Sequence, residues 1–144
     1  MNYDLIVIGE GVSGLTCALE AARSGLRTAT LESNLFGGLV LNVNELDGYP
    51  GEESGTNFAS TLMQSCAEAG VTSIQEEVTA VSTHGPAFDV VTRAGTHGTR
   101  AVVIASGARL KKLGVPGERE FEGRGVSWCA DCDPPMFQNE EVLV

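Results

Sequence analysis

Two cysteines near the end of the 144-residue chain, Cys129 and Cys132, are separated by two residues and followed directly by Asp133. Thiols at this spacing can close a small, easily reversed disulfide, and the neighbouring carboxylate can pass a proton as thiol and thiolate interchange. The alternatives are a pair of inert core thiols and a zinc site. Zinc needs four ligands, and no ligand spacing pairs the other candidates, which are Cys17, Cys66, His84 and His97. Redox chemistry is therefore favoured. The candidate catalytic residues are Cys129, Cys132 and Asp133, and no metal is expected.

A glycine-rich turn near the start of the chain, Gly9-Glu10-Gly11-Val12-Ser13-Gly14, follows the apolar run Leu5–Ile8 and opens a stretch with helical spacing. In this context the first glycine allows a tight turn, and the second lets the backbone approach a pyrophosphate. The third permits close packing of the helix on the strand, and the helix start stabilises negative charge. The turn therefore predicts a dinucleotide site.

An acidic residue, Glu32, ends the next apolar run, about 20 residues after the turn. Its carboxylate can accept both hydroxyls of a ribose and would repel a 2′-phosphate. The alternative is a glycine-rich turn with an unrelated surface glutamate, which the strand-turn-helix context disfavours. The pattern predicts FAD or NAD rather than NADP at this site.

Composition and charge exclude several classes of function. The formal net charge of −10 argues against a nucleic-acid partner, which needs a basic face, and against docking on anionic lipid. No apolar run reaches the roughly 20 residues of a membrane-spanning helix, and no basic leader precedes the first apolar run. Four cysteines without an export signal do not suggest a disulfide scaffold. We therefore expect a cytoplasmic protein with no membrane or nucleic-acid partner.

The first part of the chain reads as a β-α-β unit. Continuous apolar residues indicate a strand at Leu5–Ile8 that is buried on both faces. Helical spacing follows over Leu15–Ala22, where Gly25 suits the end of the helix. Leu26–Leu31 indicates a second strand, and residues 36–51 have the turn-forming chemistry of a binding loop.

A second helix is expected over Asn57–Ala69, before three strand-like runs, Val78–Thr83, Phe88–Thr92 and Thr99–Ala105. Glycine-containing turns separate these runs, which indicates a small antiparallel meander whose last strand returns to the parallel sheet. The two histidines of the chain fall in these turns and are expected to be solvated.

Together these elements predict an α/β protein, with a Rossmann-like three-layer domain and a small antiparallel β-meander over residues 1–114. Residues 115–144 are expected to hold a linker, the Cys-x-x-Cys segment and the first strand of a second, incomplete domain. That strand would begin at Val142, so the chain is expected to need further polypeptide.

With these residues in this order, the chain resembles the N-terminal part of the low-molecular-weight thioredoxin reductases. The shared landmarks are the glycine-rich turn, Glu32, Tyr49-Pro50-Gly51, Ala105-Ser106-Gly107-Ala108, and Gly123–Ser127 before the Cys-x-x-Cys-Asp segment. The resemblance implies that FAD binds at the glycine-rich turn and that NADPH binds in a second domain whose site is not in this chain. It also implies a homodimer whose dithiol passes electrons to a protein or small-molecule disulfide.

The resemblance further implies roles for single residues. Cys132 would face the flavin, Cys129 would attack the substrate disulfide, and Asp133 would donate a proton. Val78 would lie against the adenine through its backbone. The expected cofactor-binding residues are Gly9, Gly11, Val12, Ser13, Gly14, Glu32, Ser33, Gly38, Leu39, Val78, Ala105, Ser106 and Gly107.

Three positions depart from the family pattern. Leu39 stands where a glutamine usually contacts the flavin, Gly48 replaces an asparagine, and Pro134 replaces a glycine. The first two changes remove hydrogen bonds to the flavin, and the proline stiffens the dithiol loop by fixing φ. They keep open a second hypothesis, an FAD-dependent dithiol oxidase that passes electrons to oxygen without NADPH. A third hypothesis is a non-catalytic nucleotide-binding module.

Overall fold

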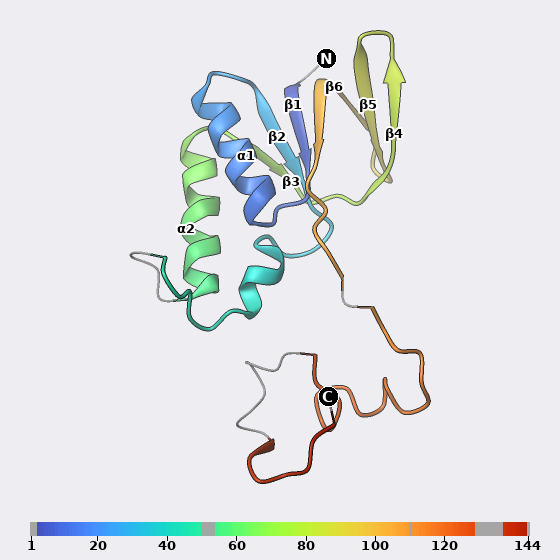
Figure 1. Cartoon of the computed structure of the whole chain (residues 1–144). Coiled ribbons are helices and arrows are strands. Elements are labelled where there is room, and N and C mark those ends of the chain that lie inside the picture. The colour runs from blue at the N-terminus through green and yellow to red at the C-terminus, as the bar shows by residue number, and fades with distance from the viewer. Residues whose placement is uncertain (1–2, 50–53, 110, 129–136, 144) are drawn as a thin grey trace. The chain divides into compact units, whose positions relative to one another are not determined.

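Two compact units make up the chain, Met1–Gly107 and Ala108–Val144. The computed structural model describes residues 3–49, 54–109, 111–128 and 137–143. The helices and strands named below all lie in the first unit (Figure 1). Cys129, Cys132 and Asp133 fall outside the described residues, so their expected roles stay predictions.

Parallel strands form the centre of a six-stranded sheet with the order β3-β2-β1-β6-β5-β4. They are β1 (Tyr3–Ile8), β2 (Thr28–Leu31), β3 (Thr72–Ile74) and β6 (Thr96–Ile104). β1 pairs in parallel with β2 on one side and with β6 on the other. This central position explains its continuous apolar run, because a parallel strand in the middle of a sheet is covered on both faces.

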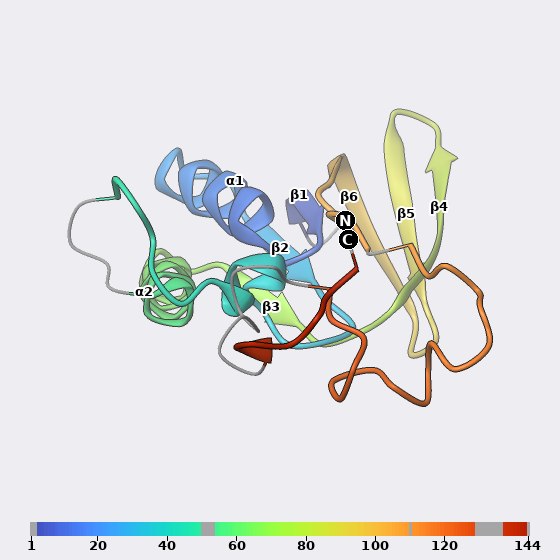
Figure 2. The same cartoon turned by 60° about the horizontal axis from the view of Figure 1, so that its bottom comes forward.

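Two helices, α1 (Val12–Arg23) and α2 (Gly55–Glu68), lie on the same side of the parallel strands (Figures 1 and 2). Leu5 and Val7 of β1 point to this side and share a buried cluster with Ala18 of α1. α2 packs on α1 through a second cluster, which contains Leu15, Leu19 and Cys66. Cys66 is 1% exposed, so this thiol belongs to the core.

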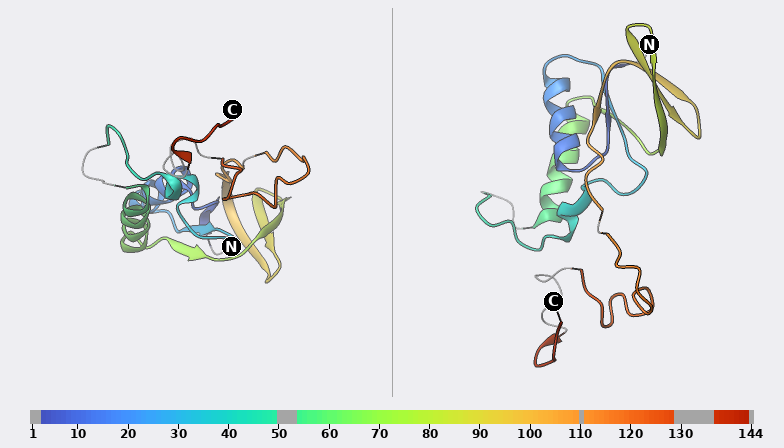
Figure 3. Two further views of the ribbon diagram at one scale, coloured as in Figure 1. Left: turned by 90° about the horizontal axis from the view of Figure 1, so that it is seen from below. Right: turned by 45° about the vertical axis from the view of Figure 1, so that its right-hand side comes forward.

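The opposite face of the parallel strands is covered by the antiparallel meander. Its strands are β4 (Val78–His84), β5 (Ala87–Thr92) and the first residues of β6. Ile6, which points away from the helices, shares a buried cluster with Val90 of β5. β6 bends between its pairing with β5 and its pairing with β1, so it belongs to both layers (Figure 3). The predicted α/β fold with three layers is therefore confirmed.

Some elements differ from the expectation. A short 3-10 helix, η1 (Gly38–Asn42), forms within the loop expected to be irregular. β3 was not predicted, because it has only three residues, two of them exposed and polar, and carries no periodic signal. β6 begins at Thr96 rather than Thr99, which places His97 in a strand, and His84 lies in β4 rather than in a turn.

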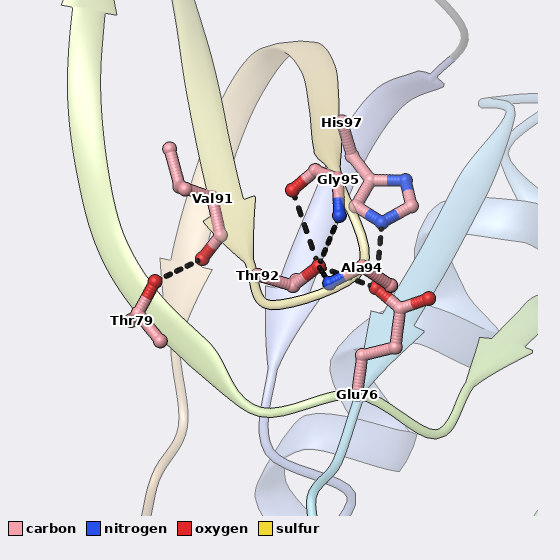
Figure 4. A network of polar contacts seen from close by, with 7 residues as sticks. All are labelled: Glu76, Thr79, Val91, Thr92, Ala94, Gly95 and His97. Carbon is pink, nitrogen blue, oxygen red and sulfur yellow. Dashed lines mark hydrogen bonds and ion pairs between the residues drawn. The ribbon is translucent and has the colours of Figure 1, made fainter.

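Glu76 joins the connection between β3 and β4 to the end of β5 and to β6 (Figure 4). Its Oε2 atom accepts a hydrogen bond from Thr92 Oγ1 at 2.6 Å and lies 3.1 Å from Nε2 of His97. The side chain of His97 is 20% exposed, so the expectation that it is solvated is wrong. Hydrogen bonds from Thr92 and His97 hold the pKa of Glu76 below its usual value. This network holds the start of the meander in place.

The described part of the second unit consists mainly of turns. Glu118 is buried and accepts hydrogen bonds from the N–H groups of Leu113 and Gly114, at 2.8 and 2.7 Å. These bonds close a turn at the expected linker. Directly before Leu113, Nζ of Lys112 lies 4.8 Å from the ring centroid of Trp128.

Val142 and Leu143, expected to begin a strand, form none in the described structure. Both side chains are exposed, and a strand needs a hydrogen-bonded neighbour to form. The expected division into residues 1–114 and 115–144 concerns the domains of a longer protein and stays a prediction. Within the described ranges, no helix is both long and apolar enough to span a membrane.

Candidate dinucleotide-binding site

Gly9 makes the turn between β1 and the helix, and the backbone there leaves no room for a side chain. Its φ of 105° is left-handed, a region that favours glycine. A Cβ atom at Gly9 would lie 2.4 Å from the carbonyl oxygen of Ala105. The N–H of Gly9 donates to the carbonyl of Leu31 at 2.8 Å. The turn is thereby locked between the ends of β2 and β6.

Gly14 lies in the first turn of α1, directly against the turn at Gly9. A Cβ atom here would lie 2.0 Å from the carbonyl oxygen of Gly9 and 3.3 Å from Cβ of Ala105. The helix can approach the strands this closely only because Gly14 has no side chain. This is the close helix–strand packing that the motif predicts.

Gly11 is different, because the space beside it is open. It is the N-cap of α1, and a Cβ atom there would have Gly37 O as its nearest neighbour, at 4.0 Å. No side chain caps the helix, and no acidic residue occupies its first turn. The first bond between the cap and the helix runs from the N–H of Leu15 to the carbonyl of Gly11, at 2.9 Å. The N–H groups of Val12, Ser13 and Gly14 therefore have no partner within the helix, which suits an anion.

Glu32 follows β2 and turns its carboxylate toward the same turn. Oε2 accepts from the N–H of Glu10 at 3.1 Å, and Oε1 accepts from the N–H of Asn34 at 2.9 Å. Burial alone would raise the pKa of Glu32, but backbone hydrogen bonds from Asn34, Glu10 and Ser33 outweigh it and lower that pKa. The group is therefore a charged acceptor at the end of β2. Ser33 beside it is exposed.

The loop before η1 lies against the glycine-rich turn. The N–H of Gly37 donates to the carbonyl of Glu10 at 2.6 Å, and a parallel bridge joins Gly37 to Gly11. A Cβ atom at Gly38 would lie 3.3 Å from Cα of Gly11, so this glycine also keeps the loop close. Leu39 follows with 56% of its surface exposed. The structure thus brings Gly38 to the turn, and Leu39 is the next residue of the chain.

The end of β6 forms the other wall of the turn. The N–H of Ala105 donates to the carbonyl of Ile8 at 2.8 Å, and the backbone of Ala105 and Ser106 touches Gly9. Gly107 follows with a φ of 67°. Val78, also expected in the site, begins β4 and has its side chain packed against the core cluster of Ile6. Its expected backbone contact with adenine stays a prediction.

Sequence reasoning missed Glu10, which is only 3% exposed. Its Oε1 atom accepts hydrogen bonds from Thr30 Oγ1 at 2.5 Å and from Ser73 Oγ at 2.6 Å. The available signal was an acidic residue between two glycines, with hydroxyl side chains inside neighbouring strands. Nothing in that pattern indicates that the three side chains meet.

The residues around the turn fit a dinucleotide. Open space at Gly11 allows a ligand to approach the backbone, and the start of α1 presents N–H groups. Glu32 offers charged acceptor atoms at the end of β2, the strand next to β1. The ends of parallel strands converge here, which is where ligands bind in open α/β sheets.

Comparisons with known proteins agree with this geometry. The sequence model of the family described as pyridine nucleotide-disulphide oxidoreductase matches residues 3–144. The thioredoxin reductase of Treponema pallidum (strain Nichols) is 40% identical over 146 residues, which is 99% of this chain and 48% of that protein. The thioredoxin reductase of Bacillus subtilis (strain 168) is 38% identical over 146 residues, 99% of this chain and 46% of that protein.

Among solved structures, the Lactococcus lactis thioredoxin reductase in its FR conformation superposes with a TM-score of 0.82. It is 36% identical and aligns with 94% of this chain and 45% of its own. The chain spans about half the length of the curated relatives it matches. The resemblance to the thioredoxin reductases is confirmed, and because the family match runs over nearly the whole sequence, the chain belongs to the pyridine nucleotide-disulphide oxidoreductase family.

Proposed function

We propose that the complete protein is an FAD-dependent, NADPH-linked disulfide reductase of the thioredoxin reductase type. The observation that carries this proposal is the open, uncapped start of α1 at Gly11, walled by the ends of β2 and β6, in a chain that is 40% identical to a thioredoxin reductase. The substrate would be the disulfide of a protein, with a small-molecule disulfide as the alternative. The NADPH site would lie in polypeptide beyond this chain.

In this proposal the pyrophosphate of FAD lies at the start of α1, held by the N–H groups of Val12, Ser13 and Gly14. Glu32 accepts hydrogen bonds from the adenosine ribose, with Ser33 beside it. The backbone of the remaining expected residues lines the site, namely Gly9, Gly11, Gly38, Leu39, Val78, Ala105, Ser106 and Gly107. FAD, when bound, supplies a two-electron carrier between a nicotinamide and a disulfide.

The dithiol of Cys129 and Cys132 would perform the exchange with the substrate. The thiolate of Cys129 attacks one sulfur of the substrate disulfide and forms a mixed disulfide, which Cys132 then resolves. The substrate gains two electrons and two protons and leaves as a dithiol, while a Cys129–Cys132 disulfide closes. Asp133 would supply a proton to a leaving thiolate.

The test uses the complete protein, purified with its cofactor. The visible absorption spectrum should have the two bands of a flavin, and NADPH added without oxygen should bleach it. Replacing Cys129 and Cys132 with serine should abolish turnover of thioredoxin disulfide while NADPH still bleaches the flavin. Turnover that survives in this double variant contradicts the proposal. A Cys17→Ser variant, at a cysteine outside the Cys-x-x-Cys motif, serves as the matched control.

A second candidate, the dithiol oxidase, is favoured by Leu39. This apolar, largely exposed side chain lies beside Gly38 at the turn, where it cannot donate a hydrogen bond to a flavin. Peroxide formation from a small dithiol and oxygen, without nicotinamide, would support the oxidase. Strict dependence on NADPH would exclude it. Homodimer formation and a cytoplasmic location belong to the main proposal, and light scattering after size-exclusion chromatography tests the dimer.

A further inference from the structure

We propose that Glu10 is a positioning residue of the dinucleotide site. Its buried carboxylate fastens the glycine-rich turn to β2 and β3, so that the turn and Glu32 hold their binding geometry before a ligand arrives. This inference rests on the proposed function where it concerns FAD. The structural part concerns the turn alone and can be tested without any ligand.

The contacts of the Glu10 side chain reach two strands that are distant in sequence. Thr30 belongs to β2 and Ser73 to β3, and both hydroxyls donate to the same oxygen, Oε1, at 2.5 and 2.6 Å. With 3% of Glu10 exposed, water contributes little to holding this charge. A buried carboxylate is costly unless it is hydrogen-bonded, and bonds to a charged acceptor are stronger than neutral ones. The carboxylate therefore keeps its two hydroxyl partners firmly.

The backbone of Glu10 forms two further hydrogen bonds, both to residues of the candidate site. Its N–H donates to Oε2 of Glu32 at 3.1 Å, which orients the proposed ribose acceptor. Its carbonyl accepts from the N–H of Gly37 at 2.6 Å, which holds the neighbouring loop against Gly11. Among the described residues of the turn, Glu10 is thus the one whose side chain binds the sheet while its backbone binds both Glu32 and Gly37. Removing the carboxylate should therefore loosen the hydrogen bonds that hold Glu32 and Gly37 in position.

Four variants separate this role of the Glu10 side chain from a simple effect of its charge. Glu10→Leu removes the acceptor, and we expect FAD to bind at least about tenfold more weakly. Glu10→Gln removes the charge but keeps an oxygen for both hydroxyls, and we expect affinity within about threefold of the wild type. Glu20→Leu removes an exposed charge from α1, the helix that follows the turn, and should leave affinity unchanged. Thr30→Val removes one donor with little change of shape, and should weaken binding even where Glu10→Leu fails to fold.

The second measurement is hydrogen–deuterium exchange in protein from which flavin has been removed. We expect the N–H groups of Gly9, Glu10 and Gly37 to exchange faster in Glu10→Leu and Thr30→Val than in the wild type. The amides in the middle of α1 should be unaffected. Unchanged exchange at the three amides overturns the inference, and so does tighter FAD binding by both Gln and Leu variants, which would indicate simple charge repulsion. A wild type that binds no FAD would defeat the proposed function, while the exchange data would still decide the role of Glu10.

Discussion

At the scale of single residues, the glycines of the turn meet three different demands. Gly9 needs a left-handed φ, Gly14 needs the absence of Cβ for packing, and Gly11 has space around it. The motif has glycine at all three positions, but only at Gly11 could a side chain be added without a clash. The folding role and the binding role of the motif therefore fall on different residues.

Alanine at Gly14 should mainly reduce stability, whereas alanine at Gly11 should mainly weaken FAD binding. Gly14→Ala places Cβ 2.0 Å from a backbone oxygen, and overpacking of this kind should cost about 3 kcal/mol of stability. Gly11→Ala should cost less than about 1 kcal/mol, because only a cap preference changes, yet weaken FAD binding by filling the open space. Urea unfolding and flavin titration check both. Gly95→Ala is the control, since nothing lies within 4 Å of its Cβ. Equal stability of the Gly14 and Gly11 variants would contradict the assignment.

Asp4 gives the chain a pH-dependent contact at the start of β1. It accepts two side-chain hydrogen bonds from Arg27, each 3.1 Å, and one from the Arg27 N–H. These bonds lower the pKa of Asp4 from 3.8 to about 2. Because the folded pKa is below the unfolded one, the contribution to stability is present above pH 3.8 and is lost as pH falls toward 2.

Asp4→Asn should therefore flatten the fall of stability in that window. We expect the wild type to lose more of its melting temperature than the variant between pH 4 and pH 2, measured by circular dichroism. Asp47→Asn, at an exposed aspartate, is the matched control and should keep the wild-type slope. Parallel curves for the wild type and Asp4→Asn would show that the contact with Arg27 does not contribute.

At the scale of elements, the meander depends on polar contacts as well as on its apolar side. Val90 anchors β5 to the core, whereas the connection from β3 to β4 is held by Glu76 on Thr92 and His97 (Figure 4). This network therefore ties the β3–β4 connection to the end of β5 and to β6.

Glu76→Ala should lower the melting temperature more than Glu77→Ala does. Glu76 bonds Thr92 at the end of β5 and His97 in β6, while its neighbour Glu77 pairs only with the exposed guanidinium of Arg93 among the contacts described. The lowered pKa of Glu76 also means that its contribution is present at neutral pH and is lost as pH falls through the folded value. Thermal melts at pH 7 and at low pH check this. A larger effect from Glu77→Ala would disprove it.

At the scale of the whole molecule, the two units contain different features of the chain. The described sheet, the helices and the candidate dinucleotide site lie in Met1–Gly107, whereas the Cys-x-x-Cys segment lies in Ala108–Val144. The buried clusters that join the layers use residues of the first unit alone. Family relatives carry about as much polypeptide again, in which the proposed NADPH site would lie.

A chain that ends at Gly107 should accordingly keep its fold. We expect its far-ultraviolet circular dichroism to retain the mixed helix and strand signal, with one cooperative thermal transition. The reason is that removal of the second unit takes no residue from the three buried clusters. A truncated chain without cooperative unfolding would show that the second unit is needed for the core.

The sequence by itself determined the features that are local. The apolar run of β1, the glycine-rich turn, α1 and Glu32 are close together along the chain, and their spacing follows from the geometry of strand, turn and helix. The class of fold followed from the order of such segments. The Cys-x-x-Cys motif likewise depends on spacing alone.

Only the tertiary structure decided which distant residues meet. Ser73 lies 63 residues from Glu10, yet their side chains share a hydrogen bond, and β3 owes its place to pairing with β2 rather than to its own pattern. His97 became a partner of Glu76 because β6 starts earlier than its apolar residues indicate. Such contacts depend on how layers pack, and a short polar segment carries no periodic signal of its own. The residues that shape the site were therefore predicted where they are neighbours in sequence and found only in the structure where the fold brings them together.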